Sequence, residues 1–214
     1  MPVDGTRRGG YPREVRTPSL DDLRARLRAR SLAPIEVPAG GKRAAVGAIL
    51  RAGEQGPEIL LIKRADKQGD PWSGQMALPG GRHEPGDADL VQTVQRETLE
   101  EVGIDLREHG DLLARLDDVH AVARGRHVGL VIAPFVFAVR GEVELVTNGE
   151  VAEALWAPIV PLWRGEAATM WPYVHEGRRL EFPGFRVGGH VVWGLTYRML
   201  SLLFEALAGD ASTP

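Results

Sequence analysis

The chain has 214 residues, of which 43% are hydrophobic, so it can bury a substantial core. It contains no cysteine, which excludes disulfides, thiolate metal sites and cysteine nucleophiles and agrees with a reducing, cytoplasmic location. The formal net charge is −3, and no apolar run reaches the roughly 18 residues of a membrane helix. We therefore expect a cytoplasmic protein that binds neither a membrane nor nucleic acid.

The beginning of the chain predicts a flexible lead followed by a helix. Residues 1–18 are rich in Arg, Gly and Pro, which favours a flexible segment, and they lack the apolar core of a signal peptide. Residues 19–30 have the pattern of an amphipathic helix, with Ser19 as N-cap and Asp22 at the capping-box position. Its arginines could bind nucleic acid, but the negative net charge favours a solvated helix face.

Three apolar runs then predict strands. Arg43–Arg51 and Glu58–Lys63 flank a turn that contains Gly and Pro, which is typical of a hairpin. Gln75–Leu78 predicts a third, shorter strand. A β-sheet is therefore expected to begin early in the chain.

The middle of the chain predicts two turns and a helix. Pro79–Gly81 is expected to make a sharp turn with exposed backbone groups, because these residues neither continue a strand nor open a helix easily. A second turn follows at Glu84–Asp87, and the last residue of this turn or Asp89 can cap the helix. Leu90–Val102 lacks Gly and Pro and has inward-facing residues at four-residue steps, which predicts a helix. Gly103 is expected to end it as a C-cap.

Four charged side chains gather on this helix: Arg96, Glu97, Glu100 and Glu101. Glu97 and Glu101 lie one turn apart on one side, and Glu100 follows Glu97 by three positions. Three close carboxylates repel one another unless a cation compensates them, and oxygen ligands suit Mg²⁺ or Mn²⁺. An exposed acidic helix face is the alternative. The Gly-Gly turn, the Arg and the terminating Gly favour a metal-dependent hydrolytic site.

The second half of the chain predicts more strands and a closing helix. His127–Val139 is a long β-branched and aromatic run, which predicts a strand buried on both faces. Tyr173–Phe182 predicts a hairpin with its turn at Glu176–Gly177. Val191–Leu207 has apolar residues at helical spacing and predicts the closing helix. Alternation of such elements predicts one domain, residues 19–210.

The pattern around this helix resembles the Nudix box, G-x5-E-x7-R-E-U-x-E-E-x-G-U, in which U is aliphatic. The residues that carry the resemblance are Gly81, Asp87, Arg96-Glu97, Glu100-Glu101 and Gly103-Ile104. Asp87 stands where the family has Glu, eight residues instead of seven separate it from Arg96, and Thr98 replaces an aliphatic residue. The resemblance implies an α/β fold, an α/β/α sandwich around a mixed β-sheet, with Glu150–Trp156 as its next short segment.

The resemblance also implies hydrolysis of a diphosphate linkage with Mg²⁺ or Mn²⁺. Glu97 and Glu101 are the expected side-chain ligands because they share a helix face, and Glu100 is a third ligand or the general base. By resemblance, the backbone carbonyl of Gly80 or its neighbour also reaches the metal. Arg96 joins Glu97 and Glu100 as a catalytic residue that orients a carboxylate or meets a phosphate.

Two further candidates for the general base follow the long strand. Glu150 or Glu153 could supply it, and ordinary surface charge is the alternative for both residues.

Upstream of the box, residues 60–81 resemble the signature of the coenzyme A diphosphatase branch of the family. The matching residues are Leu60, Leu61, Arg64, Ala65, Gly74, Leu78 and Pro79. The second Arg of that signature is missing, and Gly69 or Asp70 stands near its place. The expected substrate is a small nucleoside diphosphate derivative, coenzyme A or an acyl derivative. ADP-ribose or a dinucleotide, and a non-catalytic Nudix-fold binding module, remain alternatives. The oligomeric state stays open, with a homodimer among the options.

Several residues are expected to contact the substrate. Arg64 and Arg82 can meet its phosphates, Gly81 belongs to the binding turn, and Trp72 can stack on adenine. Further candidates for phosphate contact are Arg124, Arg126 and His127. Further aromatic candidates are Trp171, Tyr173 and Trp193, of which Trp193 is expected to pack in the core.

Overall fold

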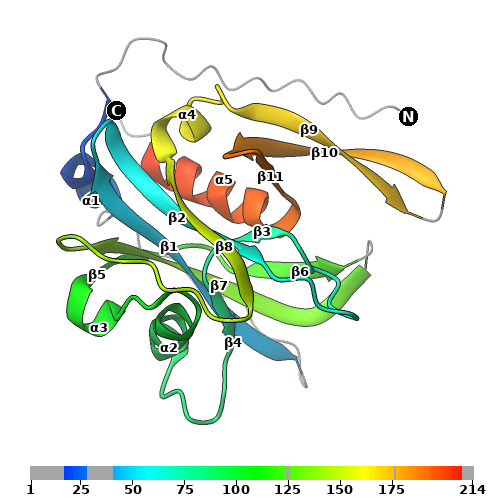
Figure 1. Ribbon diagram of the computed structural model, residues 1–214, viewed down its shortest axis with the longest axis horizontal. Coiled ribbons are helices and arrows are strands. Elements are labelled where there is room, and N and C mark those ends of the chain that lie inside the picture. The colour runs from blue at the N-terminus through cyan, green and yellow to red at the C-terminus, as the bar shows by residue number, and fades with distance from the viewer. Residues whose placement is uncertain (1–16, 28–40, 124–125, 176, 209–214) are drawn as a thin grey trace, which may run out of the picture.

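The computed structural model describes residues 17–27, 41–123, 126–175 and 177–208. Its main element is a mixed sheet with the order β3-β2-β1-β7-β5, in which β4 also pairs with β1, β6 with β7 and β8 with β2 (Figure 1). The strands are β1 (Lys42–Gly53), β2 (Gly56–Arg64), β3 (Met76–Ala77), β4 (Gly80–Arg82), β5 (Gly110–Arg115), β6 (Val119–Ala123), β7 (Arg126–Val139) and β8 (Val151–Pro158). β1 and β7 run parallel, and every other pair in this sheet is antiparallel.

Helices cover both faces of this sheet, which confirms the predicted α/β/α sandwich. The helices are α1 (Leu20–Leu27), α2 (Leu90–Val102), α3 (Leu106–His109), α4 (Ile159–Trp163) and α5 (Gly194–Ala208). α1, α4 and α5 contribute to one apolar core, and α2 and α3 contribute to the other (Figure 1). β1 divides its side chains between the two cores, since Ala44 and Leu50 face α5 and Ala45 and Ile49 face α2.

The early strand predictions are confirmed. β1 and β2 form the expected hairpin, and β3 pairs with β2. β7 is buried on both faces from Leu130 to Val139, while its first four residues are exposed. The strands β5 and β6 were not predicted.

The turn prediction for Pro79–Gly81 is wrong in part, because Gly80–Arg82 forms β4 and pairs with β1. Gly80 has a φ of 144°, and a Cβ at this residue would lie 2.3 Å from the carbonyl oxygen of Ala45. The lack of a side chain therefore lets this segment approach β1 closely enough to pair with it.

The helix that carries the charged cluster has the predicted bounds. The Asp89 side chain caps α2 by accepting a hydrogen bond from the Gln92 N–H at 2.8 Å. At the other end Gly103 has a φ of 76°, and its N–H donates to the carbonyl of Leu99. The local signals in the sequence therefore determine both ends of this helix.

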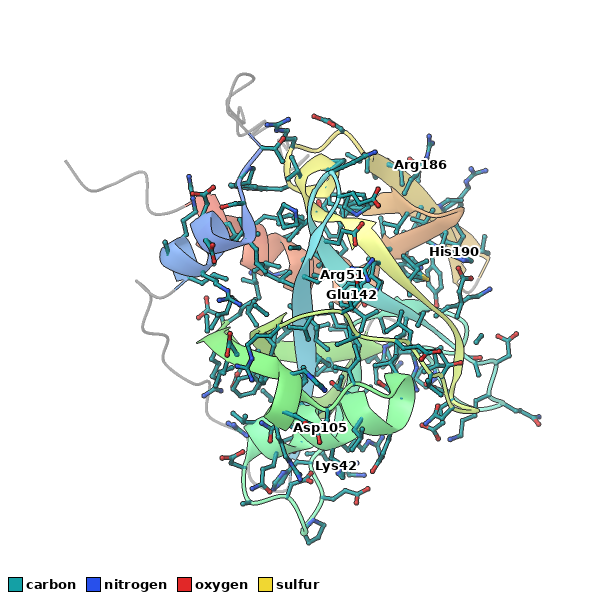
Figure 2. All side chains as sticks on the ribbon, turned by 60° about the vertical axis from the view of Figure 1, so that its left-hand side comes forward. Lys42, Arg51, Asp105, Glu142, Arg186 and His190 are labelled. Atoms are coloured by element: carbon teal, nitrogen blue, oxygen red, sulfur yellow. The ribbon has the colours of Figure 1, made fainter. Side chains whose placement is uncertain are left out.

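A second, three-stranded sheet consists of β9 (Ala168–His175), β10 (Arg178–Val187) and β11 (His190–Trp193), in the order β11-β10-β9. The predicted hairpin is confirmed, and Glu176 in its turn lies outside the described residues. The predicted start of the closing helix is wrong, since the segment before Gly194 forms β11 and pairs with β10. Two consecutive valines favour a strand there, and Gly194 has a φ of 64° that separates the strand from α5. Figure 2 shows Arg186 and His190 on this sheet, far from Lys42 at the start of β1.

At the N-terminal side, the capping box of α1 is confirmed. The Ser19 N–H donates to Asp22 Oδ2 at 2.7 Å, and the Asp22 N–H donates to Ser19 Oγ at 3.2 Å. Residues 1–16 of the predicted lead, residues 28–30 of the predicted helix and residues 209–210 of the predicted domain lie outside the described residues, so the domain bounds stay predictions. Within the described ranges, no helix combines the length and apolar character needed to span a membrane.

Candidate active site

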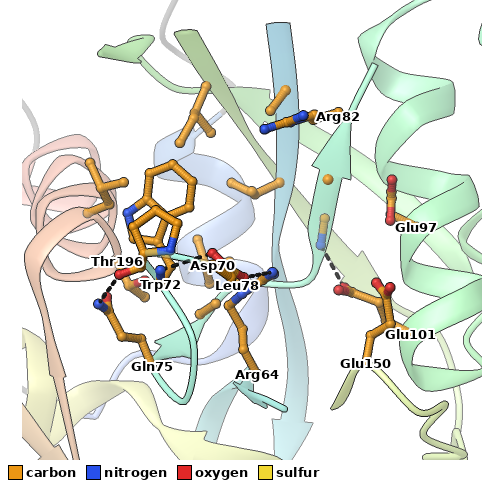
Figure 3. A pocket seen from close by; sticks show the side chains of 18 of the residues that line it. Arg64, Asp70, Trp72, Gln75, Leu78, Arg82, Glu97, Glu101, Glu150 and Thr196 are labelled. Carbon is orange, nitrogen blue, oxygen red and sulfur yellow. Dashed lines mark hydrogen bonds and ion pairs between the residues drawn. The ribbon is translucent and has the colours of Figure 1, made fainter. Parts of the chain in front are cut away.

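A cavity of about 600 Å³ lies between α2, β4, the end of β2 and α5 (Figure 3). Its charged lining residues are Arg64, Lys67, Asp70, Arg82, Glu97, Glu101 and Glu150. Its apolar lining includes Val46, Trp72, Leu78, Leu130, Ile132, Leu195 and Met199. In Figure 3 the three glutamates lie on one side of the cavity and Trp72 lies on the opposite side. The cavity therefore combines a carboxylate-rich wall with an apolar wall.

Glu101 is the most deeply buried of these carboxylates. The residue is only 3% exposed, and its Oε2 accepts one hydrogen bond from the Gly80 N–H at 2.9 Å. Burial raises the pKa of Glu101 to about 7, and the neighbouring Glu97 and Glu150 charges add to the rise, while the Gly80 hydrogen bond and Arg64 oppose it. A carboxylate in this position is stabilised in its charged form only when further positive charge is nearby.

Glu97 lies one turn earlier on α2 and packs against β4 at Gly81. A Cβ at Gly81 would lie 2.3 Å from Glu97 Oε1, so only glycine leaves room for this carboxylate. Burial also raises the pKa of Glu97, although Arg96 partly offsets the effect. Both predicted side-chain ligands on this helix face therefore reach the cavity and resist ionisation by themselves.

Arg96 holds the acidic residues around it in place. Its Nε and Nη2 donate to the two carboxylate oxygens of Asp87 at 2.9 and 3.0 Å, and its Nη1 donates to Glu97 Oε1 at 2.9 Å. Its Nη2 also donates to the carbonyl of Arg82 at 3.1 Å. The guanidinium thus joins α2 to the loop before it and orients the Glu97 carboxylate.

Glu100 does not share the position of Glu97 and Glu101. Its side chain is 54% exposed, pairs with Arg96 at 3.3 Å and does not line the cavity. Across the described ranges, no three Asp, Glu or His side chains are already arranged to hold one metal ion. Glu97 and Glu101, together with Glu150, are the carboxylates that share the cavity.

Comparison with known proteins identifies the family. Residues 41–174, more than half of the chain, match the family model of the NUDIX domain. The chain belongs to the Nudix hydrolase family. Its Nudix box is the turn and helix described above.

Two curated relatives are similar to this chain at low sequence identity. An uncharacterised protein of Schizosaccharomyces pombe is 36% identical over 165 residues, which cover 74% of this chain and 50% of the relative. The mitochondrial coenzyme A diphosphatase NUDT8 of Homo sapiens is 27% identical over 159 residues, which cover 74% of this chain and 66% of the relative. The matched region thus spans between half and two thirds of these relatives.

A solved structure supports the fold. The crystal structure of a MutT/nudix family protein from Enterococcus faecalis superposes with a TM-score of 0.53 at 20% sequence identity. The superposition covers 90% of this chain and 71% of that protein. At this level of identity it supports the Nudix fold and nothing finer.

The departure from the family pattern at Asp87 has a structural explanation. The sequence offered Asp87 or Asp89 as the cap of the helix, and the structure shows that Asp89 is the cap. Besides its two bonds from Arg96, Asp87 Oδ2 accepts hydrogen bonds from Thr93 Oγ1 at 2.9 Å and from the Glu84 N–H at 3.0 Å. The Arg96 hydrogen bonds hold the pKa of Asp87 well below its usual range, although burial opposes them. Asp87 therefore supports the Nudix helix through Arg96.

The two candidates for a base after β7 lie in different surroundings. Glu150 lines the cavity beside Glu101, and its exposed carboxylate is 3.6 Å from Lys67 Nζ (Figure 3). Its carbonyl accepts a hydrogen bond from the Ala65 N–H at 2.8 Å, which holds this loop against the end of β2. Glu153 points elsewhere and pairs with His190 on the small sheet at 2.8 Å. The structure brings only Glu150 to the Nudix site.

The predicted substrate-binding residues mostly meet at the cavity. Arg64, Arg82, Trp72 and Gly81 all line it. Arg126 and His127 lie at the exposed start of β7 and do not line it, and Arg124 lies outside the described residues.

The other aromatic candidates gather on the small sheet. Trp193 is on β11 and not on the closing helix, and its ring centroid is 6.1 Å from that of Trp171 and 5.3 Å from that of Tyr173. It is half-buried in this cluster and does not belong to either main core, so its expected core position is wrong. None of the three lines the cavity.

Sequence reasoning missed two groups of lining residues. Asp70 and Lys67 come from the loop after β2, and Leu195, Thr196 and Met199 come from α5. Thr196 Oγ1 donates to the carbonyl of Met76 at 2.9 Å, which ties α5 to β3, the short strand that precedes the Nudix box. The motif contains no signal for α5, but an Asp next to the position of the missing signature Arg was a signal for Asp70.

Proposed function

We propose that this chain hydrolyses a diphosphate linkage in a nucleoside diphosphate derivative and that it requires Mg²⁺ or Mn²⁺. The observation that carries the proposal is Glu101, a buried carboxylate at the cavity wall whose pKa is raised to about 7. Glu97 and Glu150 share this wall, so three carboxylates face one cavity beside the Nudix turn. Such a wall is expected where cations and an anionic substrate meet.

The donors on this wall suit a hard divalent cation. Within the described part of the chain, the Glu101 carboxylate accepts a single hydrogen bond, from the Gly80 N–H. Three of its lone pairs are therefore left for other partners. We assign Glu97 and Glu101 as the chief ligands, with Gly80 contributing its carbonyl, and keep Glu100 as an outer candidate. When bound, the ion supplies positive charge that offsets the diphosphate and makes water a stronger acid.

The residues of the chain then position the substrate and the water. Arg96 orients Glu97, and the Gly80 N–H orients Glu101. Arg64 and Arg82 donate hydrogen bonds to substrate phosphates. We assign Glu150 as the group that accepts the proton of the attacking water, because it is the exposed carboxylate of the cavity wall.

Coenzyme A or an acyl derivative is the first substrate candidate. The human relative named as a coenzyme A diphosphatase and the upstream signature support it. The apolar wall around Trp72 and Met199 suits an uncharged arm attached to the diphosphate. The expected products are 3′,5′-ADP and 4′-phosphopantetheine.

One observation favours a second candidate, ADP-ribose or a dinucleotide. Arg64 pairs with Asp70 at 2.7 Å, and Lys67 lies 3.6 Å from a Glu150 oxygen, so two of the three cavity cations already face carboxylates. Coenzyme A carries a 3′-phosphate in addition to its diphosphate and would need more positive charge than ADP-ribose.

A substrate panel tests the proposal. Coenzyme A, acetyl-coenzyme A, ADP-ribose, diadenosine polyphosphates, NADH and nucleoside triphosphates are incubated with Mg²⁺ or Mn²⁺ at pH 7 to 9, and products are separated by chromatography. We expect cleavage of the diphosphate linkage in at least one of them, loss of activity with a chelator, and a drop of about 10³-fold in Glu97→Gln. Ligand binding that persists without metal, in a protein that cleaves none of these compounds, would instead support a binding module.

A further inference from the structure

Arg64 is held in the cavity by one contact. It is the last residue of β2, and within the described part of the chain its side chain has a single partner, Asp70, whose Oδ2 lies 2.7 Å from its Nη2. The Arg64 Nε is buried and forms no hydrogen bond with any described residue. The direction of this guanidinium therefore depends on Asp70.

Asp70 uses its two oxygens for two parts of the cavity. Oδ2 accepts from Arg64, and Oδ1 accepts from the backbone N–H of Trp72 at 3.0 Å (Figure 3). Burial alone would raise the pKa of Asp70, but the Trp72 N–H and the Arg64 guanidinium lower it below its usual value. One carboxylate thus joins a cavity cation to the backbone of Trp72, whose side chain belongs to the apolar wall.

The loop around Asp70 is closed by one backbone hydrogen bond between its ends and stabilised by a second one inside it. The Arg64 N–H donates to the carbonyl of Gln75 at 3.0 Å, and the Asp70 N–H donates to the carbonyl of Lys67 at 3.2 Å. The loop therefore returns to β2 at the residue whose side chain Asp70 holds. This closed arrangement keeps the Asp70 carboxylate at a defined distance from the end of the strand.

The alternative partners of Arg64 are the carboxylates that we assign to the metal and the water. Arg64 is close enough to Glu101 to lower the pKa of that carboxyl. Glu150 lines the same wall of the cavity as Glu101. Without Asp70, the guanidinium would be drawn toward these glutamates and would lose its direction toward the substrate.

We propose that Asp70 is a positioning residue for substrate binding, which holds the Arg64 guanidinium toward a phosphate of the bound nucleotide and away from the glutamates. This inference rests on the proposed function, because it assigns the phosphate as the ligand of Arg64. Asp70 stands near the place of the missing signature Arg. The chain therefore has a carboxylate that directs its one remaining signature Arg, close to the position at which the signature has a second cation.

Binding and turnover in four variants test the proposal. The dissociation constant for ADP is measured by calorimetry in the presence of Mg²⁺, and kcat and KM are measured on whichever panel compound the wild-type protein cleaves. The variants are Asp70→Asn, Arg64→Gln, the double variant and Asp66→Asn. Asp66 is a matched control, because it is a carboxylate of the same loop that contacts Ser73 and does not line the cavity.

We expect Asp70→Asn to weaken ADP binding about tenfold and to raise KM by the same factor, with kcat changed less than about threefold. Arg64→Gln should have a similar effect, and Asp70→Asn should add nothing further in the Arg64→Gln background, because the two residues act as one unit. Asp66→Asn should bind ADP as the wild type does. Should Asp70→Asn not fold, Asp70→Glu takes its place and must weaken ADP binding at least about threefold relative to Asp66→Asn.

The outcomes separate this inference from the proposed function. An unchanged ADP affinity in Asp70→Asn, or an effect that persists fully without Arg64, overturns the role of Asp70 even when the wild type cleaves the panel. If the wild type cleaves nothing while the variants lose ADP affinity in the expected pattern, the role of Asp70 is supported and the proposed hydrolysis is contradicted. No measurable binding of ADP by the wild type, together with no cleavage of any panel compound, would overturn both.

Discussion

The substitution Glu101→Gln should increase the stability of the metal-free protein while it abolishes activity. The pKa of Glu101 is raised from 4.5 to about 7 in the folded state, because the carboxyl is buried near Glu97 and Glu150. The folded state thus prefers the protonated form. This preference contributes fully to stability below about pH 4.5 and is lost as the pH rises through 7.

The size of the effect follows from the shift. At about 1.36 kcal/mol per pKa unit, charging Glu101 costs the folded metal-free protein about 3 kcal/mol by pH 8. Gln has nearly the same shape, carries no charge and can still accept the hydrogen bond from the Gly80 N–H. The free energy of unfolding of Glu101→Gln, minus that of the wild type, should therefore grow by about 3 kcal/mol between pH 4.5 and pH 8.

Urea denaturation with a chelator present, at pH 5, 6, 7 and 8, measures this difference. Glu100→Gln is the matched control, because its half-exposed side chain sits on the same turn of α2 and should show no such trend. Mn²⁺ at about 100 times its dissociation constant should stabilise the wild type by about 2.7 kcal/mol and Glu101→Gln much less. A difference in the free energy of unfolding between Glu101→Gln and the wild type that stays the same at every pH would refute the reasoning. Full activity in Glu101→Gln would refute it too.

Three further substitutions test other parts of the site. Asp87→Asn should lower the free energy of unfolding by about 2 kcal/mol at pH 7 in urea denaturation. Because the pKa of Asp87 is lowered, this difference should shrink as the pH falls below about 4, and a difference that stays constant in acid would contradict the assignment. Gly81→Ala should reduce kcat at least about tenfold by displacing Glu97, whereas Gly86→Ala, which has open space for a Cβ, should not. Glu150→Gln should reduce kcat about 10²-fold with a similar KM. An unchanged kcat would show that Glu150 is an ordinary surface charge and not the general base.

The helix of the site shows how far local signals reach. Asp89, the uninterrupted run to Val102 and Gly103 define α2 to the residue, because capping and periodicity act within a few positions of the chain. The side of the helix that carries Glu97 and Glu101 follows from the same spacing. The burial of Glu101 does not, since it depends on β4 lying against the helix.

Short-range patterns were misleading where neighbouring strands decided the outcome. Gly80 and Gly81 are typical of a turn, yet the approach of β1 makes this segment a strand. The valines before Gly194 continue a helical pattern, yet pairing with β10 places them in β11. In both places hydrogen bonds to a distant strand outweigh the local preference.

The sequence by itself determined the family motif, the three glutamates with their Arg, the strands β1, β2, β3 and β7, and the helix α2. Only the tertiary structure decided which of these residues share a cavity. It separated Glu100 from Glu97 and Glu101, brought Glu150 beside them and showed Asp70 as the partner of Arg64. Composition and spacing report on neighbours along the chain, whereas burial and ion pairing depend on segments that only folding brings together.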